Sequence, residues 1–161
     1  MSALLVSDAA LLPADEVFRE ALTYLAQKLG AVRPLDPEAL PADRAAAIAA
    51  LDVWAGPDAA NWRRELIRFY ESHAPVHLAP DPDLNALLRR ARRDGVRLVV
   101  VSPLPREAAE LSLAHVGARR SAEAVLGEEE GDPLAAARLL VGEELTPVPD
   151  RQALVAALAG A

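Results

Sequence analysis

Apolar residues along the chain fall into short continuous runs separated by longer amphipathic segments. Four runs are typical of buried strands, and they occupy residues 3–7, 96–101, 124–126 and 139–141. Between and after the later runs, helical spacing predicts helices over residues 83–94, 105–115, 132–138 and 151–159. This alternation predicts an α/β, Rossmann-like core of three layers, with a parallel sheet covered by helices.

A block of helical sequence separates the first predicted strand from the second. Its first helix begins at Asp15 and ends at Gly30, with helically spaced apolar residues: Val17, Phe18, Ala21, Leu22, Leu25 and Leu29. Two further helices are predicted over 42–53 and 58–72, with Trp62, Leu66, Phe69 and Tyr70 in the latter. We therefore expect a core of residues 1–14 and 81–161, with a helical insertion of residues 15–80.

Composition narrows the classes of partner. The 161 residues carry a net charge of −7, which repels phosphodiester backbones, so no nucleic-acid partner is expected. No apolar run approaches a membrane span, and the N-terminus lacks the basic region of a signal peptide. The expectation is a cytoplasmic protein without a membrane partner. Cysteine is absent, so no thiolate chemistry is available. Lys28 is the single lysine, so any mechanism that needs a lysine must use it.

Polar residues follow two of the predicted strands. Asp8 comes directly after residues 3–7, and Ser102 directly after residues 96–101. Ligands of open parallel sheets bind at the carboxyl ends of the strands, where both residues are expected to lie. Each also has a structural interpretation: Asp8 as a turn-capping residue and Ser102 as a helix N-cap. The acidic run at 128–130 is interpreted as solvated surface.

The order of these segments resembles the haloacid dehalogenase-like superfamily with a small helical cap after the first strand. Residues 4–8 (LLVSD) resemble its first motif, an apolar strand that ends in a nucleophilic aspartate, and residues 15–22 resemble the cap helix that follows. Residues 99–102 (VVVS) resemble the second motif, and residues 105–110 the helix after it. Residues 139–144 (LLVGEE) resemble the fourth motif, whose acidic residues hold magnesium.

This resemblance implies a set of roles for hydrolysis of a phosphomonoester. Asp8 takes the position of the nucleophile, and Ser102 that of the residue that binds the phosphoryl group. Asp8, Glu143 and Glu144 are the implied Mg²⁺ ligands. A carboxylate can attack phosphorus when a metal neutralises the phosphoryl oxygens and a nearby acid protonates the leaving oxygen.

The sequence departs from this pattern at two catalytic positions. The acid is expected two residues after the nucleophile, where Ala10 stands, followed by Leu11 and Leu12. No lysine lies between 120 and 135, where the third motif is expected; Arg119 and Arg120 are candidate replacements. Loss of a general acid alone removes about 10²–10⁴-fold in rate.

Three functional interpretations remain open on the sequence. The first is a non-catalytic or nearly inactive pseudoenzyme that binds a small phosphorylated molecule or a protein partner. The alternative is a Mg²⁺-dependent phosphatase-type hydrolase of a small phosphorylated metabolite. The third is a shortened domain that pairs as a homodimer through an exposed sheet edge.

Overall fold

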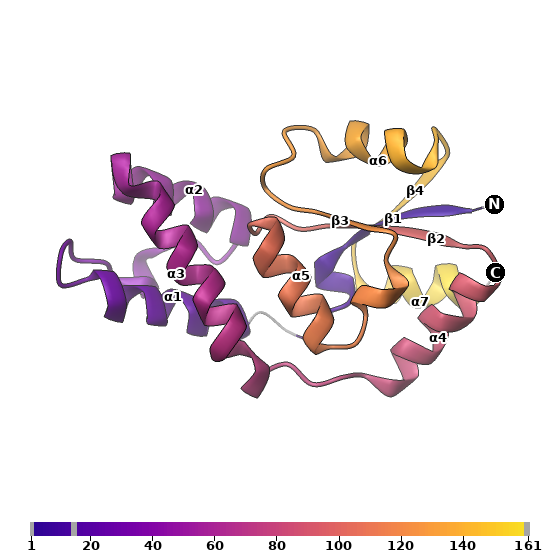
Figure 1. The fold of residues 1–161 in the computed structure, drawn as a ribbon, viewed down its shortest axis with the longest axis horizontal. Helices are drawn as coiled ribbons and strands as arrows, with labels where there is room; N and C mark the ends of the chain where they lie inside the picture. Colours follow the sequence, from indigo (N-terminus) through magenta and orange to yellow (C-terminus); the bar gives the residue numbers. More distant parts are fainter. Residues whose placement is uncertain (1, 14–15, 160–161) are drawn as a thin grey trace.

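The computed structural model describes residues 2–13 and 16–159. The described residues include a sheet of parallel strands in the spatial order β3-β2-β1-β4 (Figure 1). The strands are β1 (Ala3–Ser7), β2 (Arg97–Val101), β3 (Ala124–Leu126) and β4 (Leu145–Val148). Central β1 pairs with β2 from Ala3↔Arg97 to Ser7↔Val101, and with β4 from Ala3↔Leu145 to Val6↔Val148. The α/β class with a parallel sheet is therefore confirmed.

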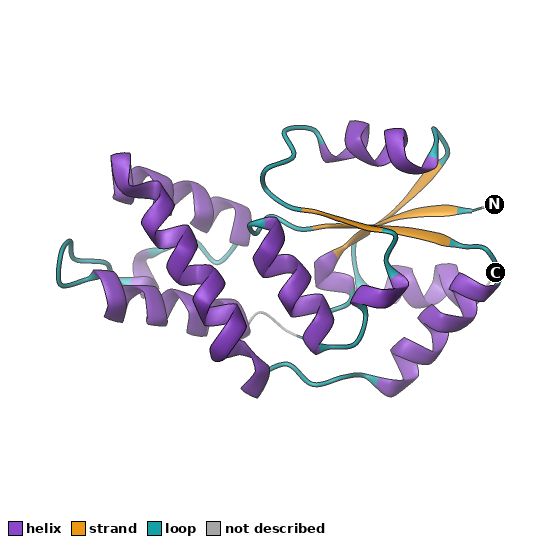
Figure 2. Ribbon diagram, in the orientation of Figure 1, coloured by secondary structure: helices purple, strands orange, loops and turns teal. Residues whose placement is uncertain are grey.

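Helices cover both faces of the sheet (Figure 2). One face carries α6 (Pro133–Val141), and the other carries α4 (Pro82–Arg93), α5 (Arg106–His115) and α7 (Arg151–Ala159). Side chains of a strand alternate between the two faces, so β2 contributes to two cores. Val99 packs with Leu126 and Ala137 on the α6 side, whereas Leu98 and Val100 belong to the larger core on the other side.

Three helices stand beside the carboxyl ends of the strands (Figure 1). They are α1 (Glu16–Leu29), α2 (Arg44–Ala55) and α3 (Ala59–Ser72), and we call residues 16–72 the helical unit. Of the apolar residues predicted for α1 and α3, Leu29 is half-buried and the others are buried: Val17, Phe18, Ala21, Leu22, Leu25, Trp62, Leu66, Phe69 and Tyr70. The predicted helix start at Asp15, and the predicted boundary after residue 14, lie outside the described residues. None of the described helices is long and apolar enough to cross a membrane.

The predicted strand at residues 139–141 is wrong. These residues are the last turn of α6, which Gly142 ends with a positive φ of 97°. The fourth strand begins at Leu145 and contains Pro147, which pairs with Leu5. Proline removes a backbone donor and is tolerated on the edge strand of a sheet, where one side needs no partner. The apolar run that resembled a strand lies largely at the surface, with Leu139 89% exposed.

Candidate functional site

Asp8 lies at the carboxyl end of β1, in a short turn over Asp8–Ala10. Its carbonyl oxygen accepts hydrogen bonds from the backbone N–H groups of Leu11 (2.9 Å) and Leu12 (3.1 Å). Its side chain is fully buried and faces Arg44. The Arg44 guanidinium donates from Nη1 to Oδ2 at 2.8 Å and from Nη2 to Oδ1 at 2.5 Å. Both oxygens of the predicted nucleophile therefore pair with a cation of the helical unit.

The start of α2 places Arg44 over the end of β1. Asp43 is the N-cap, and its carboxylate accepts the N–H of Ala46 at 2.9 Å. Arg44 is then the first helical residue, and side chains at that end of a helix tilt back towards its N-terminus. The Arg44 side chain is only 12% exposed, so the ion pair is largely shielded from water. The cap thus makes Arg44 the first residue of α2, at the end of the helix that meets Asp8.

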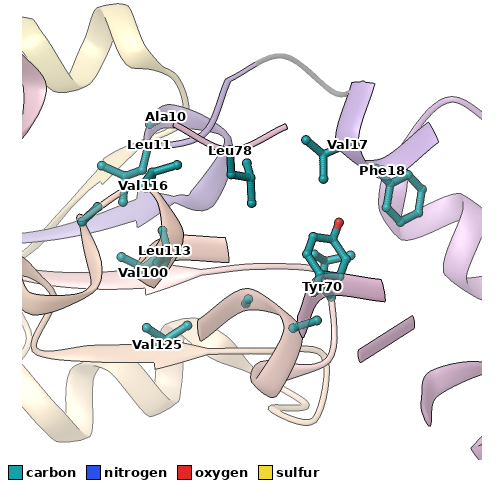
Figure 3. Packing of buried hydrophobic residues seen from close by; sticks show 14 of the residues in the cluster. Ala10, Leu11, Val17, Phe18, Tyr70, Leu78, Val100, Leu113, Val116 and Val125 are labelled. Atoms are coloured by element: carbon teal, nitrogen blue, oxygen red, sulfur yellow. The ribbon is translucent and has the colours of Figure 1, made fainter. Parts of the chain in front are cut away.

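The position of the missing acid faces the hydrophobic core. Ala10 is fully buried and Leu11 is 2% exposed, and both pack in the cluster that contains Leu113 and Val116 (Figure 3). The backbone carbonyl of Ala10 accepts a hydrogen bond from Arg151 Nε at 3.0 Å. A carboxylate here would be buried among apolar side chains. The turn after β1 is therefore packed as a structural element.

Ser102 lies directly after β2 and is 3% exposed. Its Oγ accepts the N–H of Leu104 at 3.1 Å, and its own N–H donates to the Leu126 carbonyl at 2.9 Å. The interpretation of Ser102 as a helix N-cap is wrong, because α5 begins at Arg106 and Pro105 takes the cap position. The hydroxyl instead stabilises the turn between β2 and α5.

A groove of about 540 Å³ lies at the carboxyl edge of the sheet on the α6 side. Ser102 lines it together with Ser7, Glu128 and Glu130, whereas Asp8 is not part of its lining. Sequence reasoning assigned Ser7 no role in this groove. The alternation of side chains along β1 could have indicated this position, because Leu5 and Ser7 share one face of the strand and line the same groove.

The structure does not bring Asp8 together with Glu143 and Glu144. The fourth strand was predicted at residues 139–141, before the two glutamates. In the structure the glutamates come before β4 instead, and the pairing Ala3↔Leu145 puts them at the amino edge of the sheet. Asp8 follows β1 at the opposite edge. The Glu143 side chain is 84% exposed and lies 3.5 Å from Arg138. Across the residues that the structure describes, no group of three or more potential ligands can hold a metal.

The acidic residue that follows β4 is Asp150, which sequence reasoning missed. The pairing Val6↔Val148 places the carboxyl ends of β1 and β4 side by side. The carboxylate of Asp150 accepts the backbone N–H of Ala153 at 2.8 Å and so caps the start of α7. Its position directly after Val148-Pro149 could have indicated this role, but the fourth strand was predicted at residues 139–141 instead.

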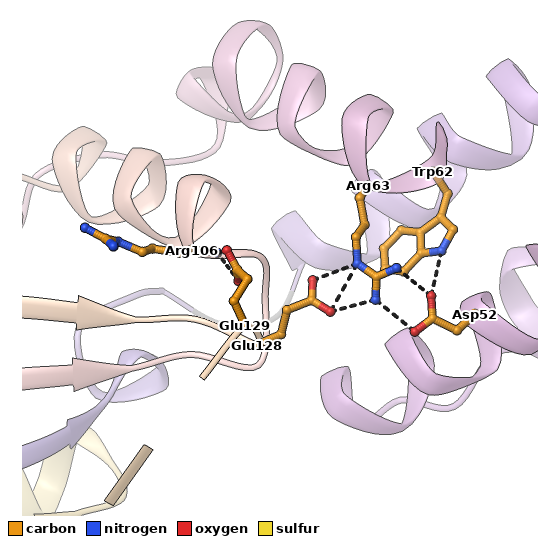
Figure 4. A network of polar contacts seen from close by, with 6 residues as sticks. All are labelled: Asp52, Trp62, Arg63, Arg106, Glu128 and Glu129. Atoms are coloured by element: carbon orange, nitrogen blue, oxygen red, sulfur yellow. Dashed lines mark hydrogen bonds and ion pairs between the residues drawn. The ribbon is translucent and has the colours of Figure 1, made fainter. Parts of the chain in front are cut away.

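A second ionic contact joins the helical unit to the α/β part (Figure 4). Arg63 of α3 donates to Asp52 of α2 at 2.7 and 2.8 Å and to Glu128, after β3, at 2.7 to 3.2 Å. Its guanidinium also lies 4.4 Å from the centre of the Trp62 ring. The hydrogen bonds that Arg63 donates to Asp52 and Glu128 raise the pKa of Arg63, and the hydrogen bond to Asp52 lowers the pKa of that carboxyl.

The interpretation of residues 128–130 as solvated surface therefore fails for Glu128, whereas Glu129 is exposed as predicted. Glu128 binds Arg63, and its side chain is only 17% exposed. Glu129 accepts the backbone N–H of Arg106, at 2.9 and 3.2 Å from its two oxygens, at the first residue of α5. This acidic run holds α5 and the helical unit in place.

A pocket of about 300 Å³ lies between the helical unit and the α/β part. Val17, Phe18 and Leu78 form apolar walls, and Arg44 also lines it. Tyr70 belongs to the same lining, and its hydroxyl points towards the space between Val17 and Leu78 (Figure 3). The pocket is partly apolar, and its charged wall is the arginine that binds Asp8.

The fold and the site define an α/β protein with a helical insertion after the first strand and an ion-paired aspartate at the end of that strand. No family model and no curated protein matches the sequence. The fold is found in other solved structures. A protein from Lactobacillus delbrueckii subsp. bulgaricus assigned as a phosphoglycolate phosphatase is 18% identical, with a TM-score of 0.53 over 91% of this chain and 76% of that chain.

The second structure is a protein from Thermotoga maritima assigned as a beta-phosphoglucomutase. It is 15% identical, with a TM-score of 0.56 over 99% of this chain and 81% of that chain. At these identities the matches establish the fold, and they confirm the haloacid dehalogenase-like fold inferred from the order of the sequence motifs.

Proposed function

We propose that this chain is a haloacid dehalogenase-like protein that acts by binding and has lost catalysis. The observation that carries the proposal is the buried pair of Asp8 and Arg44. A carboxylate that attacks phosphorus needs an accessible oxygen lone pair. Here both oxygens accept hydrogen bonds from a guanidinium, at 2.8 and 2.5 Å, and the side chain has no exposed surface.

The surroundings of Asp8 support the same proposal. The acid position is occupied by Ala10, which is packed in the core, so neither the leaving oxygen nor the attacking water has a proton-transfer partner there. Glu143 and Glu144, the residues expected to complete a magnesium site, lie at the other edge of the sheet. Each change removes a different requirement of phosphoryl transfer.

We propose the pocket beside Arg44 as the binding site and a small phosphorylated molecule as its occupant. A volume of about 300 Å³ accommodates a small metabolite, and Val17 and Phe18 offer an apolar wall. A guanidinium is well suited to a phosphate group, and Arg44 is the cation of this pocket although its Nη1 and Nη2 atoms already donate to Asp8. A protein partner that contacts the same pocket is the other way in which the scaffold would act by binding.

The second candidate function is a Mg²⁺-dependent phosphatase. It is favoured by the two structures of similar fold, which are assigned as a phosphatase and a phosphoglucomutase. This function requires that Arg44 separate from Asp8, so that the carboxylate can reach a metal and a substrate. The two candidates therefore differ in whether Asp8 becomes accessible in solution.

The deciding experiment measures Mg²⁺ binding by calorimetry and hydrolysis of para-nitrophenyl phosphate and small phosphorylated metabolites. The variants are Asp8→Asn and, as a control for an exposed carboxylate, Glu143→Gln. We expect no hydrolysis above background and no Mg²⁺ binding that depends on Asp8. Turnover that Asp8→Asn abolishes and Glu143→Gln preserves would overturn the proposal and establish the phosphatase.

A thermal-shift screen with the same phosphorylated molecules tests binding directly. Ala9 lines the pocket and is itself exposed, so Ala9→Phe fills the pocket from its rim without disturbing the core. A ligand of the pocket raises the melting temperature of the wild type and leaves that of Ala9→Phe unchanged. An equal shift in both proteins would place the ligand elsewhere on the molecule.

A further inference from the structure

A groove of about 610 Å³ lies between the end of α4 and the short turn Arg119–Ser121, and arginines line most of it. Arg89, Arg92 and Arg93 come from α4, and Arg120 comes from the turn. We call this the basic groove. We propose that it binds the polyphosphate group of a small ligand that carries two or more phosphates.

Local structure brings these arginines together. Positions 89, 92 and 93 are three and four residues apart, so they share one face of α4. Arg92 Nη1 donates a hydrogen bond of 2.7 Å to the backbone carbonyl of Arg120, which fastens the end of the helix to the turn. Ser121, beside Arg120, is buried. The hydrogen bond from Arg92 to the Arg120 carbonyl thus holds the groove in shape without a ligand.

The charge of the groove is not neutralised by neighbouring carboxylates. Asp94 lies 3.9 Å from Arg90, which is outside the groove, and Glu123 pairs with Arg97. The hydrogen bond from Arg97 lowers the pKa of Glu123, which keeps that pair ionised. Over residues 2–13 and 16–159, the groove arginines 89, 92, 93 and 120 form no ion pair with a carboxylate.

Helix electrostatics explain only part of this concentration of charge. Cations stabilise the last turn of a helix by interacting with its dipole, which accounts for Arg92 and Arg93. Arg120 belongs to a separate element, yet it faces the same groove. In a chain of net charge −7, such a cluster produces a local positive potential that attracts anions.

The number and type of cations indicate the ligand. Guanidinium groups bind phosphate oxygens through paired hydrogen bonds, and a single phosphate monoester carries a charge of only about −2 at neutral pH. Four guanidiniums therefore suit a di- or triphosphate better than one phosphate. Both a nucleotide and inorganic polyphosphate provide this chemistry.

The basic groove is separate from the site around Asp8. The turn that holds Arg120 comes before β3, and α4 ends before β2, so both lie at the amino edge of the parallel sheet. Arg119 and Arg120 therefore do not replace the missing lysine at the carboxyl edge. Arg119 instead donates to Glu110 at 3.3 Å and to the Ala122 carbonyl at 3.1 Å. Binding in the groove is independent of the proposed function.

Titration calorimetry with tripolyphosphate, ATP and orthophosphate tests this proposal. The groove variant is Arg89→Gln with Arg120→Gln, which spares the Arg92 contact. The control is Arg68→Gln with Arg90→Gln, which removes the same charge from two exposed arginines that pair with Glu65 and Asp94. Tripolyphosphate or ATP is expected to bind the wild type at one site, and orthophosphate more weakly.

The groove variant is expected to bind at least about tenfold more weakly, because it loses charge-assisted hydrogen bonds, and the control to stay within about twofold of wild type. ATP binding tighter than tripolyphosphate binding identifies a nucleotide, and the reverse identifies inorganic polyphosphate. Equal weakening in both variants would reduce the effect to net charge and overturn the proposal. So would the absence of saturable binding by either probe to wild type.

Discussion

Replacement of Arg44 by methionine tests how strongly the helical unit is held on the end of β1. Methionine keeps an apolar stem of similar length but removes the guanidinium, which leaves Asp8 buried without its cation. Removing one partner of a buried ion pair is destabilising by about 3–5 kcal/mol. We expect Arg44→Met to lower the free energy of unfolding by that amount.

A direct estimate from the geometry agrees with this range. The N···O distances of 2.8 and 2.5 Å correspond to charge centres about 4 Å apart, which interact by about 4 kcal/mol at an effective dielectric constant of about 20. The control is Arg68→Met, whose guanidinium pairs with Glu65 but is 59% exposed. That surface pair is expected to contribute at most about 1 kcal/mol.

The assay is urea-induced unfolding at neutral pH, followed by far-UV circular dichroism and by tryptophan fluorescence. Trp54 and Trp62 are the two tryptophans of the chain, and both lie in the helical unit, so fluorescence reports on that unit. If the ion pair holds the unit in place, circular dichroism and fluorescence will report different midpoints of urea unfolding for Arg44→Met.

A double variant that removes both charges tests whether the loss of stability comes from the unpaired Asp8 carboxylate. In Asp8→Leu with Arg44→Met no buried charge remains, so most of the lost stability should return. A loss below about 1 kcal/mol in Arg44→Met, or no recovery in the double variant, would show that the pair is not what stabilises this contact.

The remaining predictions concern the backbone near α5 and the Arg63 contact. A Cβ at Gly127 would lie 2.4 Å from the backbone nitrogen of Arg106, so Gly127→Ala should lose about 1–3 kcal/mol of stability in urea unfolding. Gly131→Ala, which meets open space, should change by less than about 0.5 kcal/mol, and equal midpoints would contradict the steric argument. Arg63 holds the pKa of Asp52 below its usual value of 3.8, so the unfolded chain binds more protons and stability falls as the pH drops through the lower, folded pKa. Asp52→Asn should therefore flatten the loss of stability in acid, and an unchanged acid slope would refute the coupling.

Sequence patterns located most of the helices and strands but missed β4. Residues 3–7, 124–126 and 151–159 have the predicted bounds, and each segment carries buried apolar residues at the spacing of its element. β4 contains Thr146 and Pro147, both exposed, so its sequence resembles a loop. It is a strand because β1 supplies the hydrogen-bonding partner, and that pairing is invisible in a local window.

Of the candidate site residues, Asp8 and Ser102 lie at the predicted edge of the sheet, whereas Glu143 and Glu144 lie at the opposite edge. The motif order located Asp8 and Ser102 at the carboxyl ends of neighbouring strands, where the pairing Ser7↔Val101 places them. The partner of Asp8 is 36 residues away in the sequence, on a helix whose orientation depends on the packing of the whole helical unit. Sequence alone gave no means to pair Asp8 with Arg44 rather than with a metal.

The carboxylates at this edge of the sheet share a property that bears on the proposed loss of catalysis. Asp8 binds Arg44, Glu128 binds Arg63, Glu129 binds the first N–H of α5, and Asp150 caps α7. A magnesium-dependent site needs carboxylates that share a cation, whereas each of these neutralises a separate structural donor. Restoring an acid at position 10 would therefore be insufficient for activity, because the remaining carboxylates already stabilise the fold and the attachment of the helical unit.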